Sequence, residues 1–308
     1  MKKYSNLIII ILSFATLFLI LCNKTLISRT IITSFSIWFN TLVPSMFPMF
    51  ILSDILISYN FTMYIPKKII NFISKIFNIS DSSVVIIFLS MISGFPTNAI
   101  NIKNAYDNNM ISKNEAEHLL LFNHFANPLF VLETIGTFYL NNYRIGIIIL
   151  ISLILGSIII GVLFRNKNHT TLVNYISKND NCQSFGTILS EAIKKSINSL
   201  LMISGTVTLF LVLSTLIINV FNLNNFTAVL IQGTLEMTMG TSFVSSLNIN
   251  DIVKVVSTTS IIAFGGLSIH LQVISILDDK IRYRNYFIGR LCHAFISGVI
   301  AFIVMLLI

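Results

Sequence analysis

The residues from Ile145 to Phe164 form an uninterrupted apolar run with no charged side chain. One helix needs about 20 such residues to cross the hydrocarbon core of a bilayer. Further long apolar runs lie at Leu7–Cys22, Met202–Phe221 and Leu291–Ile308. Charged residues make up only 10% of the 308-residue chain, whereas soluble domains contain about a quarter. The sequence therefore predicts an all-α polytopic membrane protein.

The net charge is +8, and most basic residues flank apolar runs. These residues are Lys2, Lys3, Lys67, Lys68, Lys75, Arg165, Lys167, Lys194 and Lys195. This placement is typical of topology signals and of contact with anionic lipid. The sequence contains no nucleic-acid-binding motif, and its three cysteines are too far apart for a disulfide framework or a metal site. We therefore expect membrane lipids as partners, and neither nucleic acid, metal nor cofactor.

A polar, basic stretch at 165–190 divides the chain into two similar halves. We predict an N-terminal transmembrane helix at 1–30, with its N-terminus in the cytoplasm, and a first repeat at 31–164. A cytoplasmic linker at 165–190 and a second repeat at 191–308 would follow. The midpoint position and the basic character of the linker are the basis for placing it in the cytoplasm.

Two of the apolar runs are broken by glycine and then turn polar. The run at 84–91 is followed by Gly94-Phe95-Pro96, and a shift of 171 residues places Gly94 on Gly265. In hydrocarbon, a broken helix must be buried in protein or face a watery cavity. Interrupted segments at matching places in two halves indicate a transporter's binding site. The N-terminus of each restarted helix favours an anion, so the sequence predicts a central, anion-friendly cavity.

The predicted substrate-binding residues follow these breaks. They are Gly94, Pro96, Thr97, Asn98, Asn101 and Lys103 in the first half, and Gly265, Gly266, Ser268, His270, Gln272 and Arg290 in the second. Each has a structural alternative. The amide and hydroxyl side chains could satisfy backbone freed by the breaks or bond to neighbouring helices. Lys103 could extend to the interface, His270 could bond between helices, and Arg290 could be a helix-end charge.

Three further residues are predicted to have coupling or structural roles. Glu236 and Glu133 lie inside apolar runs, where acidic side chains are costly and therefore functional by default. Glu236 could carry a coupling proton or pair with Arg290 or His270. Glu133 could instead reach water near a helix end. Asn127 precedes a proline in the segment "HFANPLF" and belongs to the same group.

Four segments together resemble one family. They are "SGFPTNAINIKNAYDNNMISKNEAEHLLLF" (93–122), "PSMFPMFILSDIL" (44–56), "GTLEMTMGT" (233–241) and "AFGGLSIHLQVISIL" (263–277). In this order they resemble the YlbJ-type sporulation integral membrane proteins with nucleoside-recognition (Gate) domains, from about Ser36 to the C-terminus. The chain departs from the family pattern at Asn98, where glycine is usual, and at Glu133, where a small residue is expected.

The resemblance implies a fold related to concentrative nucleoside transporters, with broken helices and re-entrant hairpins. It also implies passage of dipicolinic acid across the outer forespore membrane of a sporulating bacterium. The first hypothesis is therefore a secondary transporter of dipicolinate or a similar small organic anion. A nucleoside or other small-solute carrier of the same fold is the first alternative, and a non-transporting scaffold of the spore envelope is the second. A coupling ion and a homo-oligomer are compatible with each carrier hypothesis.

An enzyme is not expected. The sequence contains no HExxH zinc motif, no Gly-x-Ser-x-Gly elbow and no phosphate-cradling loop. The absence of a Walker motif also indicates that the chain does not drive transport by hydrolysing ATP itself.

Overall fold

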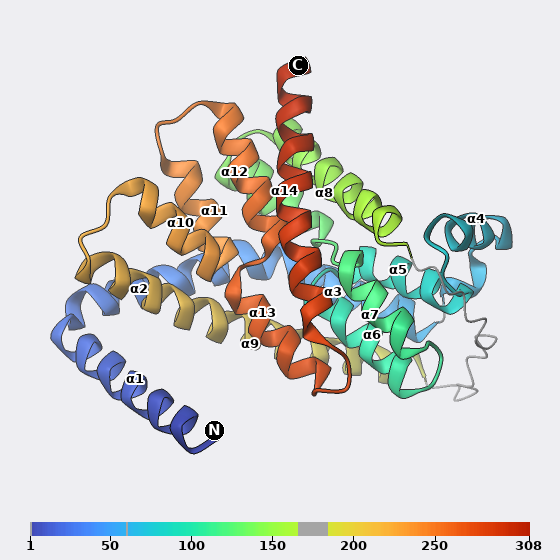
Figure 1. Cartoon of the computed structure of the whole chain (residues 1–308), viewed down its shortest axis with the longest axis horizontal. Helices are drawn as coiled ribbons and strands as arrows, with labels where there is room; N and C mark the ends of the chain where they lie inside the picture. Colours follow the sequence, from blue (N-terminus) through green and yellow to red (C-terminus); the bar gives the residue numbers. More distant parts are fainter. Residues whose placement is uncertain (1, 60, 166–183) are drawn as a thin grey trace.

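The computed structural model describes residues 2–59, 61–165 and 184–308, and all regular elements in these ranges are helical (Figure 1). The first half contains α1 (Lys2–Cys22), α2 (Lys24–Ile37), the π-helix η1 (Trp38–Leu42), α3 (Val43–Ser58), the 3-10 helix η2 (Phe61–Tyr64), α4 (Lys67–Phe77), α5 (Asp81–Ser93), α6 (Thr97–Asp107), α7 (Lys113–Phe122), the π-helix η3 (Phe130–Tyr139) and α8 (Tyr143–Leu163). The second contains α9 (Phe185–Val220), α10 (Asn225–Leu235), α11 (Met237–Ser246), α12 (Asp251–Phe264), α13 (Gly266–Leu277) and α14 (Tyr283–Leu307).

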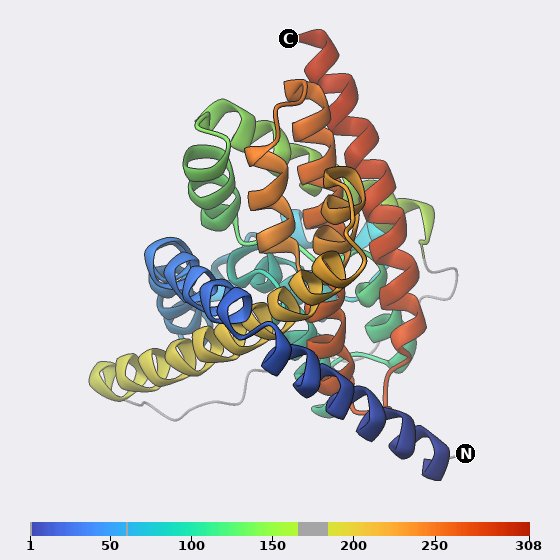
Figure 2. The same cartoon turned by 90° about the vertical axis from the view of Figure 1, so that its left-hand side faces the viewer.

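Five helical segments of the described chain are long and apolar enough to cross a membrane. They are Lys24–Ser58, Tyr143–Leu163, Phe185–Val220, Asp251–Leu277 and Tyr283–Leu307. Helices α4 and α5 form a further apolar pair, bent by 98°. The prediction of an all-α polytopic membrane protein is confirmed. The predicted first span lies in α1, which projects from the body of the molecule with its apolar side chains exposed (Figures 1 and 2).

Helix α14 packs against α7, α8 and α12, and runs along one side of the molecule (Figures 1 and 2). Small residues allow this close approach. A Cβ on Gly289 would lie 2.0 Å from the carbonyl oxygen of Leu121, and one on Gly298 would lie 2.4 Å from Ser260 Oγ. Close backbone packing through small residues is typical of helices in membranes. In lipid the hydrophobic effect contributes little to helix association, so van der Waals packing becomes more important.

The two broken helices have matching boundaries. Helix α5 ends at Ser93 and α12 ends at Phe264, which are 171 residues apart. After the breaks, α6 and α13 restart and pack against one another, as do the helices that follow them, α7 and α14. The elements that the repeat hypothesis makes equivalent are therefore neighbours in space. Such an arrangement places both breaks in the interior, as the backbone of a broken helix requires.

Most of the predicted linker, residues 166–183, lies outside the described residues. The residues from Phe185 onward already belong to α9, which begins before the predicted boundary at 191. Ser184 marks the start, because its hydroxyl accepts a hydrogen bond from the backbone N–H of Thr187 at 3.3 Å. A serine in this position caps a helix N-terminus and stabilises its first turn.

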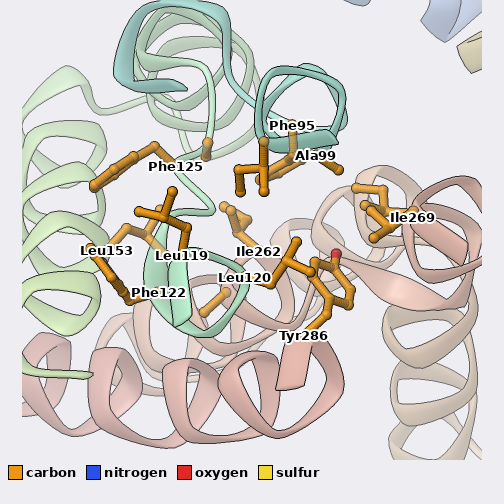
Figure 3. Packing of buried hydrophobic residues seen from close by; sticks show 14 of the residues in the cluster. Phe95, Ala99, Leu119, Leu120, Phe122, Phe125, Leu153, Ile262, Ile269 and Tyr286 are labelled. Carbon is orange, nitrogen blue, oxygen red and sulfur yellow. The ribbon is translucent and has the colours of Figure 1, made fainter. Parts of the chain in front are cut away.

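The main core joins the two breaks. It contains side chains from α5, α6, α7 and α8 together with side chains from α12, α13 and α14. Figure 3 shows Phe95 of the first break, Leu120, Ile262 and Tyr286 gathered in one region of this core. The shared core holds both breaks in fixed positions relative to each other.

Candidate functional site

The first break is held against the loop that follows α7. Gly94 has φ +72°, and a Cβ there would lie 2.7 Å from the backbone nitrogen of Asn127. The Asn127 Oδ1 accepts hydrogen bonds from the backbone N–H groups of Leu129 and Phe130, at 2.9 and 3.2 Å. Asn127 therefore starts the next helix while its backbone covers the break. Only glycine allows this approach with this backbone conformation.

The second break is held against a helical hairpin. Helices α10 and α11 are each too short to cross a bilayer. They pack against one another on either side of Glu236, with Gly233 and Gly240 in close contact. The tip of this hairpin contacts the break, because a Cβ on Gly266 would lie 3.1 Å from Glu236 Cα. Gly266 has φ +72°, so glycine is favoured there for both its conformation and its size.

Arg290 joins the two breaks from the N-terminal third of α14. Its Nε donates to the carbonyl oxygen of Phe264 at 2.9 Å, and its Nη2 donates to that of Ile262 at 3.2 Å. Its Nη1 donates to the carbonyl oxygen of His124 at 3.3 Å. The first two carbonyls belong to the last turn of α12, where a helix lacks internal donors. The buried guanidinium thus satisfies the broken helix end and ties it to the loop of the other half.

The guanidinium of Arg290 also lies 5.2 Å from the ring centroid of Phe95 and 5.8 Å from that of Tyr286. Cation–π contacts of this kind stabilise a charge that has left water. The side chain is therefore fully engaged with protein groups. In this conformation it has a capping role and does not line the cavity described next.

A central cavity of about 30 Å³ lies between the breaks and the hairpin tip. Its walls are formed by Leu42, Met46, Phe95, Pro96, Phe130, Ile203, Thr206, Val207, Glu236, Met237, Thr238, Ser268, Ile269 and Gln272. Three helices, α6, α11 and α13, begin at its edge, so their N-terminal partial positive charges meet there. The cavity has room for about one water molecule. The cavity is therefore too small in this conformation for an organic solute.

Glu236 is buried at the cavity wall, at the point where the hairpin turns. Its Oε2 accepts a hydrogen bond from the backbone N–H of Met239 at 2.7 Å, which caps α11. Within the described residues, no ion pair joins it to Arg290 or His270. The anion-favouring N-terminus of α11 is thus occupied by the protein's own carboxylate.

Among the predicted binding residues, Pro96, Ser268 and Gln272 line the central cavity. The amide Nε2 of Gln272 donates to Thr206 Oγ1 on α9 at 2.9 Å. Thr97 and Asn101 belong instead to a larger neighbouring cleft. Residues that follow the first break therefore line both the cavity and the cleft, whereas those that follow the second break line the cavity.

Other predicted residues have structural partners in this conformation. The Asn98 Nδ2 donates to the carbonyl oxygens of Asn123 and Phe125, both at 3.3 Å. His270 forms hydrogen bonds through Nδ1 with Tyr283 Oη at 2.6 Å and through Nε2 with the carbonyl oxygen of Phe264 at 3.1 Å. These contacts match the structural alternatives, in which polar groups satisfy backbone freed by a break.

Two predicted charged residues lie away from the cavity. Lys103 pairs with Asp107 one helical turn later, and Asp107 Oδ1 also accepts from Lys280 Nζ at 3.2 Å. This charged group links the turns that end α6 and α13. Glu133 is exposed on the π-helix η3. Neither Lys103 nor Glu133 contributes to the cavity wall.

Sequence reasoning missed several residues of the site. Thr238 lies two positions after Glu236 in the segment "LEMTMG", but the acidic residue alone was singled out. Thr206 lies in an apolar run whose helix carries no break, so no local signal marked it. Asp54 and Lys195 face the larger cleft. In the sequence, Lys195 is one of the basic residues that flank apolar runs, and Asp54 is a single charge within an apolar run.

Fold and site together define an all-helical integral membrane protein with two paired helix breaks around a central cavity. Comparison with curated proteins finds similarity to the sporulation integral membrane protein YlbJ of Bacillus subtilis (strain 168). The identity is 27% over 304 residues, which cover 87% of this chain and 74% of the relative. This similarity confirms the YlbJ-type resemblance that the motifs indicated. No known family model matches the chain, and no solved structure matches it.

Proposed function

We propose that the chain is a secondary carrier of a small organic anion, with dipicolinate as the leading substrate. The single observation that carries the proposal is the meeting of two broken helices and a hairpin tip around one cavity. A break costs several kcal/mol for each unpaired backbone group in hydrocarbon. Two breaks at matching positions are a feature of alternating-access carriers, in which they surround the solute.

The direction and setting of transport rest on the resemblance. The relative is a sporulation integral membrane protein by name. Transport of dipicolinate across the outer forespore membrane would fit such a setting. The N-termini of α6 and α13 at the cavity support an anionic substrate, because they carry partial positive charge, whereas that of α11 is already capped by Glu236.

Transport would require the hairpin to move. The cavity has room for about one water molecule in this conformation, so a solute needs more space than the present contacts leave. The contact between Gly266 and the hairpin tip at Glu236 joins the hairpin to the second break. Separation of this tip from the break would enlarge the cavity without disturbing the bonds made by Arg290.

One observation favours the alternative, a carrier of nucleosides or other neutral solutes. The polar part of the cavity wall consists of neutral groups, such as Ser268 and Gln272, and the carboxylate of Glu236. No lysine or arginine of the described chain lines this cavity. A neutral solute with several hydroxyl groups would suit such a wall by hydrogen bonding.

Uptake into proteoliposomes tests the proposal. Purified protein is reconstituted, and the uptake of labelled dipicolinate and of labelled uridine is measured side by side under several ion gradients. Saturable uptake of dipicolinate alone supports the anion carrier. Saturable uptake of uridine alone replaces the substrate class. No uptake of either by folded protein would contradict transport and favour the scaffold hypothesis.

A further inference from the structure

We infer that the cleft between α3, α6 and α9 is a binding site for a carboxylate-bearing solute, with Lys195 as the residue that pairs with the carboxylate. The inference rests on the proposed function. It gives the anion a positively charged partner, which no residue of the described chain supplies in the central cavity. Its evidence is independent of the cavity. It comes from the size of the cleft, from two unpaired polar atoms in its wall and from the placement of two charges.

The cleft has a volume of about 420 Å³, within the usual range for small-molecule sites. Its wall is formed by Phe50, Ser53, Asp54, Ile57, Ser93, Thr97, Ile100, Asn101, Asn104, Lys195, Ser196, Asn198 and Ser199. On α6, the three polar residues Thr97, Asn101 and Asn104 recur at helical spacing and so share one face. Helix α9 presents a second polar face opposite. The wall thus combines apolar side chains with several hydrogen-bonding groups, as small-molecule sites do.

Two polar atoms in this wall lack partners within the described residues. They are the Oγ of Ser53 and the Nδ2 of Asn101, and both are buried. Buried polar groups are almost always hydrogen-bonded to protein or to an ordered molecule. Beside a cleft, such a donor and hydroxyl can be satisfied by water or by a bound solute. A solute with hydrogen-bonding oxygens would satisfy both.

Asp54 and Lys195 face the same cleft as opposite charges. They lie close enough to interact electrostatically. No ion pair within 4.0 Å joins them in the described chain. The Lys195 ammonium is therefore available to a ligand carboxylate, which forms a strong charge-assisted hydrogen bond with such a donor. The Asp54 carboxylate would repel the same ligand, so the two residues have opposite predicted effects.

The cleft and the central cavity are lined by successive turns of the same elements. On α3, Ser53 and Phe50 face the cleft, whereas Met46 faces the cavity. Across the first break, Thr97 faces the cleft and Pro96 faces the cavity. The Gly94 turn therefore separates two adjoining hollows. A solute bound in the cleft would be next to the cavity that the moving hairpin enlarges.

Binding of dipicolinate to the full chain in nanodiscs of neutral phosphatidylcholine tests the inference by calorimetry. Lys195→Gln should weaken binding by about 10- to 100-fold, the usual effect of a lost charged hydrogen bond. Lys194→Gln is the matched control, because Lys194 is an exposed neighbour on α9 that does not line the cleft. Asp54→Asn should tighten binding at least about twofold by removing a like charge. Pyridine-2,6-dimethanol, which has the same shape without charge, should bind much more weakly to the unaltered protein.

The outcomes separate this inference from the function on which it rests. If dipicolinate binds the unaltered protein and Lys195→Gln has the same affinity as Lys194→Gln, the carboxylate site lies elsewhere and the carrier proposal stands. If folded, unaltered protein binds uridine but not dipicolinate, the anion function and this inference both fail. The same binding measurement in nanodiscs that contain phosphatidylglycerol tests whether a lipid phosphate, and not a solute carboxylate, occupies the cleft. If dipicolinate binds Lys195→Gln and Lys194→Gln alike in phosphatidylcholine, and only the binding of phosphatidylglycerol depends on Lys195, the cleft is a lipid site and the inference is overturned.

Discussion

Gly265→Ala is predicted to destabilise the protein strongly, because this glycine is required for two independent reasons. Gly265 has φ +89°, a left-handed conformation in which an L-residue is strained by about 1–2 kcal/mol. The new Cβ would also lie 2.4 Å from the Nη2 of Arg290. That atom ends a long side chain, but the guanidinium is buried and bonded to three carbonyl oxygens, so it cannot turn away freely.

The two effects add to a substantial loss. Displacement of the guanidinium would break at least one hydrogen bond from a charged group, worth about 1.5–3 kcal/mol. Together with the backbone strain, the expected loss of unfolding free energy is about 3–5 kcal/mol. A change of this size is diagnostic of a specific mechanism, since most substitutions cost less.

Reversible unfolding in mixed detergent micelles, followed by far-UV circular dichroism, measures this loss. Gly205→Ala is the matched control, because a Cβ at Gly205 meets no atom within 4 Å and the residue lies inside α9. That variant should be neutral or more stable by up to about 1 kcal/mol from helix propensity. If both alanine variants unfold alike, the described packing of Arg290 against the second break is wrong.

Three further predictions concern charged residues. Arg290→Lys should lower the free energy of unfolding by about 3 kcal/mol or more, because one ammonium cannot serve three separate carbonyls; the same detergent titration measures it. Glu236→Ala should cost about 1–2 kcal/mol by removing the cap of α11, and Glu236→Gln should cost less, because its amide oxygen still accepts; equal losses would refute a capping role. The hydrogen bond from Lys103 lowers the pKa of Asp107 below 3.8, with a further contribution from Lys280. This stabilisation is therefore present above pH 3.8 and is lost as the pH falls through the lowered pKa. Asp107→Asn should therefore reduce the fall in the thermal unfolding midpoint below pH 4. An unchanged dependence of this midpoint on pH would contradict the stabilising role of the Asp107 carboxylate.

The architecture could be predicted from the sequence because a membrane span is a continuous local run of apolar residues. The uncharged run at Ile145–Phe164 and the breaks at Gly94 and Gly265 are strong local signals. In the structure the run forms most of α8, and the two glycines follow the ends of α5 and α12 with positive φ. The start of α9 was placed too late, since the apolar pattern is weak in its first turns and the Ser184 cap was overlooked.

The roles of individual polar residues were less accessible, because the direction of a side chain depends on tertiary packing. His270 follows a break, as a ligand-binding residue would, but its ring bonds to Tyr283 and to the carbonyl oxygen of Phe264. Lys103 pairs with Asp107 four residues later, a spacing that was visible in the sequence. In contrast, Lys195 and Asn101 are distant in the chain and come together only because α6 and α9 line the same cleft.

Counterflow in proteoliposomes tests the central claim most directly. Vesicles that contain the purified protein are preloaded with unlabelled dipicolinate, and the entry of labelled dipicolinate is followed over time. A carrier that alternates around one site predicts a transient accumulation of label above equilibrium, which disappears when uridine replaces the internal dipicolinate. The account would be contradicted if labelled dipicolinate entered vesicles that contain the folded protein no faster than it enters protein-free vesicles, with or without preloading.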